Sequence, residues 1–188
     1  MRKLIVALAT LASVAGLAFA AGGPAQAEGS VNPFADQARA AGLSMDQART
    51  LQANVDRELA ASGGKQVAAN KIEWAGGETL VPLPGEATVR DLTAAARPTY
   101  NRCPYLYLCT FYGTNFTGTM HLMKECREYS DETYTQSFHS WINNQSNGTK
   151  AQFRNWAHNT ILTTGLPLSY DKDSDWLGDY TDFFKPCN

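Results

Sequence analysis

Apolar residues in the first half of this chain of 188 residues follow a helical period. The spacing predicts an amphipathic helix from about Met45 to Ala61. Ser44, with Gln47 three residues later, forms a capping box that begins the helix, and Gly63 ends it. The apolar positions of this pattern are Ala48, Leu51, Val55 and Leu59.

Beyond this helix the pattern changes to short segments rich in strand-forming residues. Segments 66–74 and 78–83 are joined by Gly76 and Gly77, which predicts a hairpin. Segments 105–112 and 119–123 are separated by the turn residues 113–115, which predicts a second hairpin.

The start of the chain has the pattern of a secretory signal peptide. Arg2 and Lys3 precede an apolar run over residues 4–21, and the triplet Ala25-Gln26-Ala27 follows. A transmembrane helix is the rival interpretation, but a Gly-Gly-Pro break before the triplet favours cleavage after Ala27. We therefore expect a signal peptide over residues 1–27 and a soluble, exported mature chain.

The rest of the chain divides by composition. Residues 28–98 hold no cysteine and are predicted to form a small α+β unit of helix plus hairpin. Three interpretations of this unit stay open: a removed propeptide, a module packed on the next domain, or a partly ordered linker. Residues 93–98, TAAARP, give the predicted boundary. Residues 99–188 form the second predicted domain, and we expect the N-terminal unit to contribute little to its fold.

Charge and cysteine usage narrow the class of protein. The formal net charge is −2, so the chain has no electrostatic reason to bind nucleic acid or anionic membranes. All four cysteines lie after residue 100, which in an exported chain predicts two disulfides, with three possible pairings. The paired Cys-x2-Cys spacing typical of zinc sites is absent from the sequence.

A larger motif surrounds the second predicted hairpin. Phe111, Phe116 and Gly118 stand as aromatic-x4-aromatic-x-Gly, which resembles the signature of a βγ-crystallin Greek key. Cys-Pro-x4-Cys precedes it at residues 103–109, and Ser-Trp-Ile-Asn-Asn follows at residues 140–144. Together these residues resemble the secreted actinobacterial peptidase inhibitors typified by the Streptomyces metalloproteinase inhibitor, whose fold is βγ-crystallin-like.

The resemblance implies a fold and a function. The fold would be an all-β, βγ-crystallin-like Greek-key sandwich with two disulfides over residues 99–188. The function would be inhibition of a secreted peptidase, most simply a metallopeptidase, by a rigid disulfide-supported loop that enters the cleft in extended form. The protein would be extracellular and monomeric, without a cofactor. The sequence does not locate the inhibitory loop.

The resemblance also implies a disulfide pairing. Many relatives hold only the Cys-Pro-x4-Cys pair, so Cys103 would pair with Cys109 and leave Cys126 to pair with Cys187. The family's crystallin unit usually occurs twice, yet no second aromatic-x4-aromatic-x-Gly is found near Phe153. The second half is therefore expected to be degenerate or folded differently.

Two alternative functions come from other residue types. The high density of aromatic residues suggests a cell-wall or carbohydrate-binding module. We expect Phe111, Phe116 and Trp141 to lie in the core. For Tyr105, Tyr107 and Tyr112, a place in the core and a role in stacking on sugars are about equally expected. A calcium-binding, crystallin-type structural protein is the second alternative. The weak candidate ligands are Asp171, Asp173 and Asp175, in a window without the glycine that an EF-hand needs at its sixth place, and Asn143 and Asn144, followed by an Asn-Gly turn.

An enzyme is not predicted. The three histidines show no catalytic spacing, and His121 is expected to be a surface residue of a strand. The cysteines are expected to be bridged, so none is a candidate nucleophile.

Overall fold

The computed structural model describes residues 33–93, 98–130 and 137–188. The predicted signal peptide and most of the predicted boundary lie outside the described residues. The helical elements are α1 (Ala35–Ala40), α2 (Met45–Ser62), η1 (Thr114–Phe116) and α4 (Asp175–Tyr180). The strands are β1 (Lys65–Ala68), β2 (Lys71–Trp74), β3 (Gly77–Leu80), β4 (Thr99–Tyr100), β5 (Cys103–Pro104), β6 (Tyr107–Phe111), β7 (Met120–Met123), β8 (Tyr129–Ser130), β9 (Ser140–Asn144), β10 (Gln152–Arg154), β11 (Thr160–Thr163), β12 (Ser169–Asp171) and β13 (Phe183–Lys185).

Helix α2 confirms the predicted amphipathic helix. The Ser44 hydroxyl accepts from the Gln47 N–H, and the Gln47 side chain accepts from the Ser44 N–H, so the capping box is complete. Gly63 ends the helix at φ 63°, a left-handed conformation that glycine adopts without cost. The sequence pattern gave no indication of α1, which precedes α2 by a short turn.

The first predicted hairpin is a three-stranded meander, because segment 66–74 contains two strands and not one. The chain turns at Ala69 and Asn70, between β1 and β2. Asn70 is fully buried, and its side-chain amide donates to the carbonyls of Val81 (3.0 Å) and Arg90 (2.8 Å). Backbone carbonyls thus pair with the buried Asn70 amide, and the turn at this residue divides a segment whose composition alone predicts one strand.

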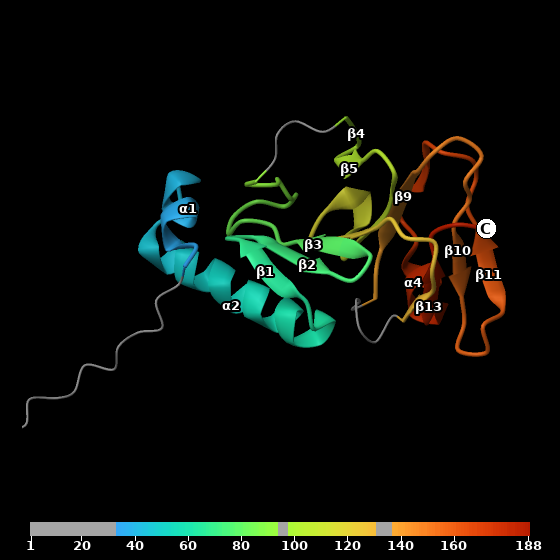
Figure 1. Ribbon diagram of the computed structural model, residues 1–188, viewed down its shortest axis with the longest axis horizontal. Helices are drawn as coiled ribbons and strands as arrows, with labels where there is room; N and C mark the ends of the chain where they lie inside the picture. Colours follow the sequence, from blue (N-terminus) through green and yellow to red (C-terminus); the bar gives the residue numbers. More distant parts are fainter. Residues whose placement is uncertain (1–32, 94–97, 131–136) are drawn as a thin grey trace, which may run out of the picture. The chain divides into compact units, whose positions relative to one another are not determined.

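The strands form two large antiparallel sheets and one small two-stranded sheet, β4-β5, so the described chain is mostly β with few helices (Figure 1). The seven-stranded sheet has the order β1-β2-β3-β7-β6-β9-β12, and the four-stranded sheet has the order β11-β10-β13-β8. Strand β8 comes from the first half of the β-domain but pairs in the four-stranded sheet, whereas β12 comes from the second half and pairs in the seven-stranded sheet. Each half therefore gives one strand to the other half's sheet.

The N-terminal unit shares a sheet with the β-domain. Strand β3 pairs with β7 over four residue pairs, from Gly77 opposite Met123 to Leu80 opposite Met120. Helix α2 lies along β1 and β2 (Figure 1), and Leu51 and Val55 belong to the same buried cluster as Leu108 and Phe138 of the β-domain. The two parts therefore share a sheet and buried apolar surface across residue 98, which argues against the expectation that the N-terminal unit contributes little to the C-terminal fold.

A buried ion pair reinforces this junction. The Lys71 ammonium lies 2.7 Å from the Glu78 carboxylate and 3.2 Å from that of Asp91. The Tyr107 hydroxyl of β6 donates to Glu78 at 3.1 Å. Burial alone would raise the pKa of Asp91, but hydrogen bonds from Thr93 and the charge of Lys71 together lower it. Paired charges tolerate burial, and removal of one partner would leave the other uncompensated.

The seven-stranded sheet is buried on both faces. One face packs on α2 and on the four-stranded sheet, and the other forms a second buried cluster that includes Phe111, Met120 and Ile142. Within the described residues, no helix is long and apolar enough to cross a membrane.

Candidate functional site

A disulfide closes a short loop, here called the ring loop, over residues 103–109. Cys103 on β5 bridges Cys109 on β6, with the two Cα atoms 5.8 Å apart, and both cysteines are fully buried. The side chains at the tip point the other way, since Tyr105 and Leu106 are each 51% exposed. The ring loop therefore has a buried covalent base and an apolar, exposed tip.

The backbone of the ring loop is fixed by hydrogen bonds as well. The Tyr105 N–H donates to the Pro98 carbonyl (3.0 Å), and the Leu106 N–H donates to the Asn144 carbonyl (2.8 Å). Leu106 has φ 81°, in the left-handed region that a bulky side chain rarely adopts. Tyr107, the next residue, is buried again. From the sequence, Tyr105 and Tyr107 are equally expected in the core and on a sugar-stacking surface. In the structure Tyr105 is exposed and Tyr107 is buried.

A second loop, over residues 164–168, lies on the other side of β9. Leu168 has φ 71°, and its N–H donates to the Asn143 carbonyl at 2.7 Å. Leu166 and Leu168 are 55% and 54% exposed. Because β6 and β12 both pair with β9, the two loops lead into neighbours of the same strand at the same end of the sheet.

Asn143 and Asn144, at the end of β9, hold the two loops with their side chains. The Asn144 amide donates to the Cys103 carbonyl at 2.8 Å, and the Asn143 amide donates to the Gly165 carbonyl at 3.1 Å. Both asparagines are buried. Sequence reasoning considered them as weak calcium ligands, but the structure gives them contacts within the protein.

The aromatic-x4-aromatic-x-Gly motif forms a folded turn at the opposite end of β6 and β9 from these loops. The rings of the buried residues Phe111 and Phe116 lie 5.5 Å apart, and Gly118 has φ 76°. The Ser140 hydroxyl accepts from the Phe116 N–H (3.1 Å) and donates to the Gly113 carbonyl (2.6 Å). Ser140 thus closes the turn from beneath.

The second disulfide joins Cys126 to Cys187, with Cα atoms 5.3 Å apart and a sequence separation of 61. The structure therefore contains the two pairs that the family resemblance implied. This bridge connects the segment that follows the β6–β7 hairpin to the last residues of the chain.

The acidic candidates for calcium are dispersed. Asp171 accepts the backbone N–H of Asp173 at 3.1 Å, and Asp175 contacts the His139 imidazole at 2.6 Å. Among the residues that the structure describes, no group of three or more His, Cys, Asp or Glu side chains could hold a metal ion.

The prediction that His121 is a surface residue is wrong. Its imidazole is 1% exposed and lies on the sheet face that α2 covers, and its Nδ1 is 2.9 Å from the Thr79 hydroxyl. The Trp74 indole N–H donates to that same hydroxyl (2.9 Å), and Thr79 donates to Nδ1 when the ring carries its proton on Nε2. Burial lowers the pKa of His121 to about 3, which keeps the ring neutral.

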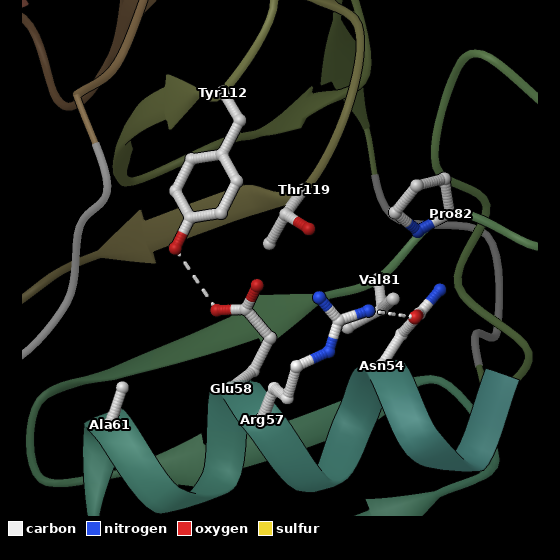
Figure 2. Close-up of a pocket in the computed structure, with 8 residues that line it drawn as sticks. All are labelled: Asn54, Arg57, Glu58, Ala61, Val81, Pro82, Tyr112 and Thr119. Carbon is white, nitrogen blue, oxygen red and sulfur yellow. Dashed lines mark hydrogen bonds between the residues drawn. The ribbon is translucent and has the colours of Figure 1, made fainter. Parts of the chain in front are cut away.

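Helix α2 and the sheet enclose a cavity of about 250 Å³ (Figure 2). The Tyr112 side chain points from the sheet toward the helix, where its hydroxyl donates to Glu58 at 3.0 Å. Burial raises the pKa of Glu58, although the bond from Tyr112 and the charge of Arg57 oppose the shift. The lining residues include no histidine or cysteine, and the carboxylate is already paired. We therefore assign these contacts to the attachment of α2 and not to chemistry.

Sequence reasoning missed the two exposed leucines and their conformation. The stretch Tyr-Leu-Tyr-Leu between Cys103 and Cys109 repeats the same two residue types, yet its first pair is exposed and its second pair is buried, a difference that residue type alone does not reveal. The loop that contains Leu166 and Leu168 carries no motif.

Comparison with known proteins bears on residues 96–160, which match the family model described as Peptidase inhibitor family I36. The matched stretch covers about a third of the chain and includes the ring loop, the folded turn and the Asn143–Asn144 pair. The comparison with curated proteins and the comparison with solved structures found no match.

The family resemblance deduced from the sequence is thereby confirmed for this stretch. This similarity to a family of peptidase inhibitors indicates an inhibitor of peptidases and not an enzyme.

Proposed function

We propose that this protein is an exported inhibitor of extracellular metallopeptidases. The match of residues 96–160 to peptidase inhibitor family I36 carries the general function. The choice of a metallopeptidase as the target rests on the Cys-Pro-x4-Cys and aromatic-glycine motifs of this chain, which resemble those of the Streptomyces metalloproteinase inhibitor. The secretory pattern of residues 1–27 and the two disulfides support action outside the cell.

Inhibition would depend on a loop that is rigid before it binds. Association costs the ordering of loops and side chains at an interface, and a loop already ordered avoids most of this cost. The ring loop meets this requirement, because a disulfide closes it and Asn144 holds both its Cys103 carbonyl and its Leu106 N–H. The protein would act as a monomer and bind one peptidase.

The fold of the inhibitor domain would be βγ-crystallin-like. The supporting observations are the folded turn of Phe111, Phe116 and Gly118, and the hydrogen bonds of Ser140 beneath it. The strand orders β7-β6-β9-β12 and β11-β10-β13-β8 also support it, because in each sheet three strands of one half are completed by one strand of the other. The second half would then be a Greek key that lacks the sequence signature.

The test is an inhibition assay of the purified protein against one peptidase of each mechanistic class. We expect loss of activity for a thermolysin-type metallopeptidase, and unchanged activity for serine, cysteine and aspartic peptidases. If no peptidase is inhibited at a hundredfold molar excess, the proposed function is wrong.

Carbohydrate binding is a second candidate, and one cavity favours it. Trp156 and Tyr180, 78% and 67% exposed, line a cavity of about 440 Å³ together with Asp179 and Asp182. Exposed rings can stack on sugar faces while carboxylates accept hydroxyl hydrogen bonds. Depletion of the protein from solution by insoluble chitin, cellulose or peptidoglycan would support this function. Full recovery of the protein in the supernatant would exclude it for these polymers.

A further inference from the structure

Four apolar side chains stand exposed around the end of β9. They are Tyr105, Leu106, Leu166 and Leu168, each 51–55% exposed, and we call them the sheet-end patch. Leu106 and Leu168 immediately precede β6 and β12, the two strands that flank β9. Their N–H groups donate to the adjacent carbonyls of Asn144 and Asn143, which places both residues at one end of the sheet.

The protein holds these two leucines in an unfavourable conformation. Three bulky apolar residues in the described part of the chain have positive φ: Leu106, Phe116 and Leu168. The conformation of Phe116 is explained by its burial against Phe111, whereas the two leucines are half exposed and contribute little to the core. Glycine would fit both backbone positions better. Backbone strain combined with an exposed apolar side chain is typical of a functional site.

The strain is maintained by a dedicated set of contacts. Asn143 and Asn144 each accept a hydrogen bond from a loop N–H with the main-chain carbonyl and donate one to a loop carbonyl with the side-chain amide. The Cys103–Cys109 bridge closes the ring loop beneath its tip. Two neighbouring residues of one strand therefore fix both loops at once. The patch is ordered before any partner arrives.

We propose that the sheet-end patch is the surface that contacts the peptidase, through pockets that accept large apolar side chains. This inference rests on the proposed function. The ring loop half of the patch lies inside the stretch that matches the inhibitor family. The exposed side chains of the patch are uncharged, and a preorganised apolar surface loses little conformational entropy on binding.

The backbone geometry specifies how the ring loop binds. The N–H groups of Tyr105 and Leu106 already donate within the protein, and Leu106 is left-handed and not extended. The tip therefore cannot add a strand to the substrate cleft of the peptidase. Side chains from two loops anchor the complex instead, with Tyr105 as the aromatic contact.

The test uses the purified protein and thermolysin as the probe. The double variant Leu106→Gly/Leu168→Gly removes two patch side chains at positions where glycine relieves strain. Its midpoint of thermal unfolding should equal or exceed that of the wild type, while its inhibition constant should rise at least tenfold. Trp176→Ala, which removes a comparably exposed apolar side chain from α4, is the control and should change the inhibition constant less than twofold.

Three outcomes would overturn the inference. If the wild type and the double variant inhibit equally, the patch does not contact the peptidase, although the proposed function stands. If the wild type inhibits no peptidase, both proposals fail. If sedimentation shows a dimer for the wild type and a monomer for the double variant, the patch joins two copies of this chain instead.

Discussion

The buried imidazole of His121 should make the protein progressively less stable as the pH falls below neutrality. Burial lowers its pKa to about 3 in the folded state, against 6.5 in an unfolded chain. Between these two values the unfolded state binds more protons than the folded state. The stabilising contribution is therefore complete above pH 6.5 and declines by about 1.4 kcal/mol for each unit below it.

The size of this effect is large for one side chain. At pH 4 the contribution lost would be about 3 kcal/mol, and at pH 3 about 4 kcal/mol. A typical domain is stable by roughly 5–15 kcal/mol in total. Tyr112 packs against the ring at 5.1 Å between centroids, and Glu58 lies beyond it on α2, bonded to the Tyr112 hydroxyl. Protonation of His121 would thus place a charge beneath the helix attachment.

Urea unfolding at pH 7.5, 6, 5 and 4 measures the effect. The variant His121→Gln keeps a hydrogen-bond acceptor near Thr79 but does not titrate. The difference in unfolding free energy between wild type and variant removes the contribution of carboxylates such as Asp91, and should shift by about 1.4 kcal/mol per unit below pH 6.5. His139→Gln, at a partly exposed histidine, is the matched control. Equal pH slopes for the wild type and His121→Gln would refute the argument.

Three further predictions concern stability. Gly118→Ala should lower the free energy of unfolding by on the order of 1 kcal/mol or more, because Gly118 has φ 76° and a Cβ there would lie 3.2 Å from the Gly113 nitrogen. Gly148→Ala, at φ 86° in open space, should lower it less in the same thermal unfolding assay. Equal losses for the two variants would show that crowding at Gly118 is unimportant. A fragment of residues 99–188 should lose cooperative unfolding, since it lacks β3 and the apolar side chains of α2, each worth about 1.5–3 kcal/mol when buried; a native-like near-ultraviolet dichroism spectrum would contradict this. The double variant Cys126→Ser/Cys187→Ser should lose about 4 kcal/mol in the chain-entropy model, as measured by urea unfolding, and an unchanged midpoint would show that the bridge constrains little.

Local patterns predicted the elements whose causes are local. The capping box of Ser44 and Gln47 begins α2 where the spacing placed it, because both hydrogen bonds lie within one turn. The turn residues 113–115 and Gly118 likewise predicted the hairpin of β6 and β7, whose register follows from its own short connection. The family motif indicated a peptidase inhibitor for the matched stretch, whereas composition and charge did not indicate any particular function.

Features that depend on contacts between residues far apart in the sequence were not predicted. The pairing of β3 with β7 joins two segments that composition had divided, and residue types alone do not reveal which strand edge another hairpin will cover. His121 has the alternation of a surface strand, and its burial results from α2 covering that face. The left-handed leucines depend on hydrogen bonds to Asn143 and Asn144, far away in the sequence. A candidate site built from two loops is visible once the sheet is assembled.

Titration of a thermolysin-type metallopeptidase with the purified protein tests the central claim most directly. Residual peptidase activity is measured after equilibration, with the enzyme concentration well above the inhibition constant. The account predicts a linear decline of activity to near zero at one inhibitor per enzyme. Full activity at a hundredfold excess of the protein would contradict it.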